Sequence, residues 1–222
     1  MKILFVGLAR AIWLFDFAAI NPSGKSLQGV IEELAKRYNF GKAPSSIIDL
    51  AEKNSLAFTA GTFTNSKDIP TLVSLNMYND GFVADTMSSS NDSDDFLRDL
   101  IGWMVSECGL KAPTTVRAGY VSQIDFECEV PLSKINPHLD EFTKVLEQIA
   151  KPADGKVRRF DLGAIHFWTE DATVTGAPAI VKFERKLNAP FSANHYFSQA
   201  PVETEVHVAL IEEFEALMKA SR

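Results

Sequence analysis

Residues 70–87, PTLVSLNMYNDGFVADTM, contain two runs of strand-forming residues separated by Asn79, Asp80 and Gly81. An Asp-Gly pair tolerates the positive φ angles that a tight hairpin requires, so the segment predicts antiparallel strands at 70–77 and 82–87. A third strand-like run, 55–63, precedes them. Short hairpin links indicate an antiparallel sheet, because parallel strands need long crossover connections.

The segments on either side of this hairpin predict one further strand and two helices. Residues 11–20, AIWLFDFAAI, are mostly apolar on both faces and predict a strand buried on both sides. A turn signal, NPSG at 21–24, follows, and an amphipathic helix is predicted from about 25 to 37. After the hairpin, a polar run leads into a second helix that ends near Cys108.

The second half of the chain repeats this order of elements. An alternating strand is predicted over 116–130, with Asp125 and other acidic residues on its exposed face. A helix over 137–150 follows, with an apolar stripe made of Leu139, Phe142, Val145, Leu146 and Ile149. Strands at 158–169, 178–186 and 193–198 and a final helix over about 203–220 complete the series.

This repetition predicts an α+β fold with an internally duplicated β-α-β-β-β-α unit. We expect mainly antiparallel sheet, in one sheet or two, with helices packed on one side. The expected organisation is a single compact domain, residues 1–222, made of two pseudo-repeats at about 8–110 and 114–220.

Composition and charge restrict the possible partners. The chain has 222 residues, 46% of them hydrophobic, which excludes intrinsic disorder and a disulfide scaffold. Its net charge of −7 repels phosphate backbones, so nucleic-acid binding is not expected, despite the basic stretches at 156–159 and 182–186.

Localisation is expected to be cytoplasmic. Residues 2–9 imitate a short secretory signal, but Arg10 interrupts the apolar run. No apolar stretch approaches the length of a membrane span, so no membrane partner is expected. Cys108 and Cys128 are interpreted as reduced thiols.

The segment Ala19–Ser26, AINPSGKS, resembles the P-loop pattern [AG]-x-x-x-x-G-K-[ST] of nucleotide-binding proteins. The resemblance implies that Gly24 and its neighbours contact phosphate, that Lys25 reaches the β/γ-phosphates and that Ser26 binds Mg²⁺, with a magnesium nucleotide as cofactor. Pro22 removes one amide donor from such a loop, and the expected sheet is antiparallel rather than parallel. The alternative interpretation is a turn followed by a helix start.

No other motif predicts a catalytic or metal site. The histidines, His138, His166, His195 and His207, form no close metal-binding pair in the sequence. The acidic cluster of Asp92, Asp94 and Asp95 lacks the glycine and distal glutamate of a calcium loop, and acids at a helix start stabilise the helix dipole. No metal, resident cofactor or catalytic residue is therefore predicted.

The leading functional hypothesis is a non-enzymatic interaction module that assembles with itself or with a partner protein. Trp13, Phe15 and Phe17 on the apolar run at 11–20 are its predicted interface. One alternative is a nucleotide-binding or phosphoryl-transfer protein that uses Gly24, Lys25 and Ser26. A second alternative is a small-ligand sensor with a pocket between the two halves.

Overall fold

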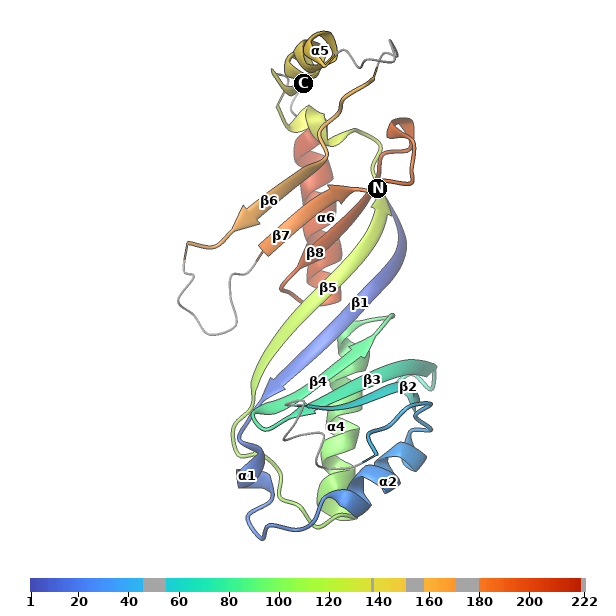
Figure 1. The fold of residues 1–222 in the computed structure, drawn as a ribbon, viewed down its shortest axis with the longest axis vertical. Coiled ribbons are helices and arrows are strands. Elements are labelled where there is room, and N and C mark those ends of the chain that lie inside the picture. The colour runs from blue at the N-terminus through green and yellow to red at the C-terminus, as the bar shows by residue number, and fades with distance from the viewer. Residues whose placement is uncertain (46–54, 137, 151–157, 171–179, 221–222) are drawn as a thin grey trace. The chain divides into compact units, whose positions relative to one another are not determined.

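The computed structural model describes residues 1–45, 55–136, 138–150, 158–170 and 180–220 (Figure 1). The strands are β1 (Lys2–Leu14), β2 (Leu56–Thr64), β3 (Pro70–Tyr78), β4 (Gly81–Thr86), β5 (Arg117–Glu127), β6 (Ala164–Trp168), β7 (Ile180–Arg185) and β8 (His195–Ala200). The α-helices are α1 (Phe17–Ile20), α2 (Gln28–Arg37), α4 (Ser90–Ser106), α5 (His138–Ile149) and α6 (Thr204–Ala220). Two short 3₁₀ helices are η1 (Leu132–Ile135) and η2 (Phe191–Ala193).

The fold is α+β and antiparallel, as the hairpin pattern predicts. Among the described residues the strands form one sheet in the order β2-β3-β4-β1-β5-β8-β7-β6. The ladders β1–β4, β2–β3, β3–β4, β6–β7 and β7–β8 are all antiparallel. The predicted hairpin is confirmed, with Tyr78 of β3 paired to Gly81 of β4 across the turn.

The contacts of the chain divide it into two compact units. The N unit comprises residues 8–122 and 202–204, and the C unit comprises residues 1–7, 123–201 and 205–222. The order β1-α2-β2-β3-β4-α4 is repeated as β5-α5-β6-β7-β8-α6. In this repeat β1 to β4 correspond to β5 to β8, and with these counterparts exchanged the strand order of the sheet reads the same from both ends. The duplicated unit is therefore confirmed, whereas the expectation of a single compact domain stays a prediction.

In both units a long helix packs against one face of the strands. Helix α4 lies behind β3 and β4, and α6 lies behind β7 and β8 (Figure 1). Both helices have 17 residues. The core of the N unit includes Phe82, Phe96 and Leu100, and the core of the C unit includes Phe126 and Phe183, all of them buried.

The prediction of a strand over 11–20 was wrong in position. The strand β1 begins at Lys2 and ends at Leu14, so it contains the run that imitates a secretory signal. Asp16 then caps helix α1, because its side chain accepts a hydrogen bond of 2.9 Å from the amide of Ala18. The strand is also not buried on both faces, since most of its residues are half-buried.

The helix predicted over 137–150 is present as α5, and none of its residues is buried. One further expectation about burial was wrong. Asp125 was expected on an exposed face of its strand but is buried. Lys186 and His195 lie at 2.7 Å and 3.5 Å from its carboxylate, and the pairing with Lys186 offsets the cost of burying this charge.

Several predicted boundaries moved inward. Helix α2 begins at Gln28 rather than at 25, the strand expected at 116–130 spans Arg117–Glu127, and the strand expected at 158–169 is reduced to Ala164–Trp168. Residues 178 and 179, expected to begin β7, lie outside the described residues.

Candidate functional site

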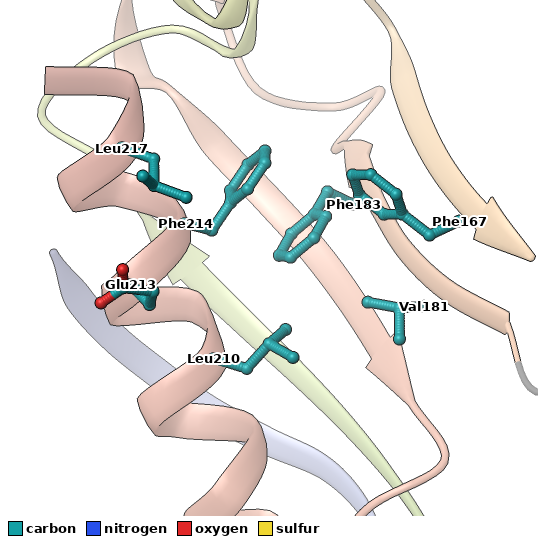
Figure 2. A pocket seen from close by; sticks show the side chains of 7 residues that line it. All are labelled: Phe167, Val181, Phe183, Leu210, Glu213, Phe214 and Leu217. Carbon is teal, nitrogen blue, oxygen red and sulfur yellow. The ribbon is translucent and has the colours of Figure 1, made fainter. Parts of the chain in front are cut away.

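An apolar pocket with a volume of about 330 Å³ lies on the C unit (Figure 2). It lies between the hairpin β6–β7 and helix α6. The lining residues are Phe167, Val181, Phe183, Leu210, Glu213, Phe214 and Leu217. Glu213 is the single charged residue among them, and Figure 2 shows its carboxylate directed away from the apolar side chains.

Local structure places these side chains on one surface. Phe167 pairs with Val181 across the antiparallel β6–β7 ladder, so both point to the same face of the sheet. On α6 the spacing of Leu210, Phe214 and Leu217 is that of one helical stripe. The rings of Phe183 and Phe214 stack with centroids 4.1 Å apart and form the floor between strand and helix.

The rim of the pocket exposes a large apolar area. The exposed fractions of Phe167 and Leu217 are 49% and 57%. β6 is the last strand of the sheet among the described residues, so this rim lies along the edge of the described sheet. Exposed apolar surface next to an unpaired edge marks an interaction site more often than a monomer surface.

The equivalent surface of the N unit is covered. Counted from the first residues of α4 and α6, the counterparts of Leu210, Phe214 and Leu217 are Phe96, Leu100 and Trp103, and all three of these counterparts are buried. Helix α2 and the residues after it supply the cover. The covering side chains in this core are Ile31, Leu34, Tyr38 and Phe40.

The predicted interface residues lie in the core of the N unit instead of on a free apolar surface. Phe15 and Phe17 are buried, and both contact the ring of Phe82, with centroids 4.9 Å and 5.8 Å away. Trp13 is half-buried, and its indole Nε1–H donates a hydrogen bond of 2.8 Å to Asp94. The apolar side chains of this segment are therefore covered by other parts of the same chain.

The P-loop-like segment forms a closed turn. Gly24 has a φ of +60°, and its amide donates to the carbonyl of Asn21 at 3.0 Å. The Asn21 side chain binds both the amide and the carbonyl of Lys25, at 3.0 Å each, so two amides of the segment donate within the turn itself. Ser26 precedes the first residue of α2 by two positions.

Lys25 is directed toward the end of helix α4. Its Nζ donates to the carbonyl oxygens of Cys108 and Gly109, at 3.3 Å and 3.2 Å. These carbonyls lie at the negative end of the α4 dipole, which a lysine stabilises. Phosphate binding by Lys25 would require that both hydrogen bonds be given up.

The histidines and the thiol that sequence reasoning left open are each placed beside polar groups. His166 lies 3.0 Å from Glu184, and His195 lies 3.5 Å from Asp125. Cys128 is buried close to Glu215, and this burial raises its pKa to about 12, so the thiol stays protonated at neutral pH. Within the described ranges, no group of three or more His, Cys, Asp or Glu residues is arranged to hold a metal ion.

A buried Ser–His pair occurs in the C unit. Ser198 Oγ donates to the carbonyl of Lys182 at 2.9 Å and lies 2.8 Å from His207 Nε2. Both side chains are fully buried, and desolvation lowers the pKa of His207 to about 4. Because the serine proton is already directed to a backbone carbonyl and the pair is closed to solvent, the geometry is structural.

The basic stretch at 182–186 is neutralised. Its three cations each lie beside a carboxylate: Lys182 at 3.5 Å from Glu184, Lys186 at 2.7 Å from Asp125, and Arg185 against Asp161.

No helix in the described part of the chain is long and apolar enough to cross a membrane.

Comparisons with known proteins assign the chain to no family. No protein-family model matches the sequence, and no curated protein matches it. Among solved structures, the chain is similar to Methanococcus jannaschii TBP, with 12% identity, 99% of both chains covered and a TM-score of 0.45.

The pocket was missed by sequence reasoning. Its residues are spread over β6, β7 and α6, and each looked like an ordinary core position. The signal that sequence does carry is the apolar stripe of the helix at 138–149, which predicts a partner for that helix.

Proposed function

We propose that the protein is a non-enzymatic interaction module that binds an amphipathic helix of a partner protein in the apolar pocket of the C unit. The observation that carries the proposal is the difference between the two repeats. The same strand–helix surface is covered by a helix in the N unit, whereas the described residues of the C unit leave it open. The proposal keeps the hypothesis of a protein-binding module and moves its surface from residues 13–17 to the C unit.

The chemistry of the pocket supports a helical occupant. A helix presents apolar side chains at i, i+3 and i+7, and the groove between β6–β7 and α6 accepts such a stripe. In the N unit the covering residues Ile31, Leu34 and Tyr38 have this spacing.

Charge supports a basic residue on that helix. Asp99 of α4 binds Arg37 at 3.0 Å, at the C-terminal end of the covering helix. Glu213 occupies the position of Asp99 in α6, and no ion pair of Glu213 is formed among the described residues. We therefore expect the partner helix to carry a lysine or arginine near its C-terminal end.

A synthetic peptide with the sequence of residues 25–40 tests the proposal, because it contains the helix that covers the equivalent surface. We expect isothermal titration to give binding in the micromolar range. A peptide with serine in place of the residues equivalent to Ile31, Leu34 and Tyr38 should not bind.

Two matched variants locate the binding site. Leu217→Asp places a carboxylate in the pocket and should weaken peptide binding at least about tenfold, since an unpaired charge would be buried. Ala216→Asp adds a carboxylate at an exposed position of α6 outside the stripe of Leu210, Phe214 and Leu217 and should leave binding unchanged. Equal binding by both variants would contradict the proposal. A wild-type dimer in light scattering that Leu217→Asp dissociates would assign the pocket to a second copy instead.

A further inference from the structure

Helix α5 is the element of the C unit that corresponds to α2. It follows the first strand of its repeat and precedes the outer hairpin, as α2 does in the N unit. Its apolar residues Phe142, Val145 and Ile149 have the i, i+3, i+7 spacing of Ile31, Leu34 and Tyr38.

The two helices differ in burial. Ile31, Leu34 and Tyr38 are at most 3% exposed, whereas Phe142, Val145 and Ile149 are 57%, 44% and 74% exposed. An amphipathic helix gains most of its stability from packing its apolar face, so α5 carries an apolar face without a described partner.

Helix α5 makes several polar contacts, and Leu139 and Leu146, which lie outside this i, i+3, i+7 set, are half-buried. Lys134 of η1 lies 3.2 Å from Asp140, and Glu147 accepts a hydrogen bond of 3.4 Å from the amide of Phe160. His138 and Glu141 pair at 3.4 Å at the exposed start of the helix. The two exposed ion pairs, those of Asp140 and Glu141, contribute little to stability.

The pocket offers the complementary surface. In the N unit the ring of Tyr38 packs edge-on against Phe96, with centroids 4.8 Å apart, and the Tyr38 hydroxyl donates to Asp99 at 2.6 Å. The counterparts in the C unit are Leu210 and Glu213, both of which line the open pocket. Ile149 would thus meet Leu210, an apolar contact without the hydroxyl–carboxylate bond.

One feature of the strands differs between the repeats. Gly61 pairs with Val73, and the ring of Phe40 lies where a Cβ of Gly61 would be. In the C unit Phe167 pairs with Val181 and places its own ring beside the pocket. In the C unit, strand β6 therefore supplies the aromatic ring itself. In the N unit the ring comes from Phe40, which follows helix α2.

We infer that α5 is a built-in lid, which closes over the pocket with Phe142, Val145 and Ile149 and which a partner helix displaces. The inference rests on the proposed function, since it assigns the regulation of the same site. The missing hydroxyl–carboxylate bond makes the closed lid weaker than the α2 cover. This weakness lets the C unit open while the N unit stays closed.

Crosslinking tests the closure directly. Ile149→Cys and Leu210→Cys are combined with Cys108→Ser, while Cys128 is retained because its buried thiol is unreactive at neutral pH. We expect a short bismaleimide to join the two engineered cysteines within one chain. Ile149→Cys with Ala216→Cys, on an exposed face of α6, is the matched control and should crosslink at least about tenfold more slowly, because the closed lid creates no high effective concentration there.

The products decide between the alternatives. An intramolecular crosslink that is specific for Leu210 supports the lid. Crosslinks only between chains, increasing with protein concentration, would overturn it in favour of exchange between two copies. The absence of any specific crosslink would also overturn it.

Peptide affinity separates the lid from the proposed function. If the closed form is populated about ten times as much as the open form, replacing Phe142, Val145 and Ile149 by serine should tighten binding of the 25–40 peptide roughly tenfold. Peptide binding without closure would contradict the lid alone. Closure without any peptide binding, even in the triple-serine variant, would contradict the proposed function alone.

Discussion

Ser90 and Thr204 exchange two hydrogen bonds, each of 3.0 Å. The amide of Ser90 donates to Thr204 Oγ1, and the amide of Thr204 donates to Ser90 Oγ. The two residues begin α4 and α6, so each hydroxyl satisfies an amide in the first turn of the other helix. Both residues belong to the N unit.

Removing either hydroxyl should destabilise the fold. Because both bonds are buried, we expect Ser90→Ala and Thr204→Ala each to lower the free energy of unfolding by about 1–2 kcal/mol. Urea denaturation measures the change. Ser90→Thr and Thr204→Ser keep the hydroxyl and serve as controls. Losses in the controls equal to those in the alanine variants would show that packing, rather than hydrogen bonding, is the cause.

Asp94 should matter far more than the acid next to it. Its carboxylate accepts hydrogen bonds of 2.8 Å from Trp13 and 2.8 Å from Tyr120, and the residue is 6% exposed. Asp94→Ala leaves two partly buried donors without an acceptor and should lower the unfolding free energy by about 2–4 kcal/mol. Asp95 pairs with Arg98 at the surface, so Asp95→Ala should change the unfolding free energy by less than about 1 kcal/mol. Equal effects of the two substitutions would contradict a structural role for Asp94.

Local chemistry explains which elements the sequence predicts well. The β3–β4 hairpin depends on residues adjacent in the chain, and its position was correct within one residue. The start of β1 was missed because Arg10 interrupts its apolar run. Arg10 pairs with Asp85 on the neighbouring strand at 2.7 Å, and this partner is 75 residues away in the chain. No local pattern reveals such a pair.

The candidate site was missed for a related reason. An apolar stripe predicts that a helix face is buried, but it does not say whether the described chain supplies the cover. The stripes of α2 and α5 look alike in sequence, yet one is buried and the other is exposed. In the same way, Asp94 looked like a dipole-stabilising acid until the fold brought Trp13 and Tyr120 to it.

Acid should destabilise the C unit through His207. Burial lowers the pKa of this imidazole to about 4, whereas in the unfolded chain it lies near 6.5. Between these values the unfolded chain binds the proton and the folded chain does not. Stability is therefore complete above pH 6.5 and is lost as the pH falls toward 4, by up to about 3 kcal/mol.

Denaturation at a series of pH values measures this loss. His207→Gln removes the titrating group, so its unfolding free energy should vary much less over this range, even if it is lower throughout. His138→Gln is the matched control, since His138 is exposed, and it should keep the slope of the wild type. A wild-type slope in His207→Gln would assign the pH dependence to other groups.

Lys25 should contribute to stability and not to nucleotide binding. Its ammonium caps the C-terminal end of α4 through the carbonyls of Cys108 and Gly109. Lys25→Ala should therefore lower the unfolding free energy by about 0.5–1 kcal/mol. Lys36→Ala, at an exposed position of α2, should have a smaller effect.

Thermal denaturation with and without millimolar Mg-ATP separates the two roles. Lys25→Ala should lower the stability by the same amount in both conditions, because the amides of Gly24 and Lys25 already donate to Asn21 within the turn. A nucleotide-dependent stabilisation of the wild type that Lys25→Ala abolishes would instead establish the P-loop alternative.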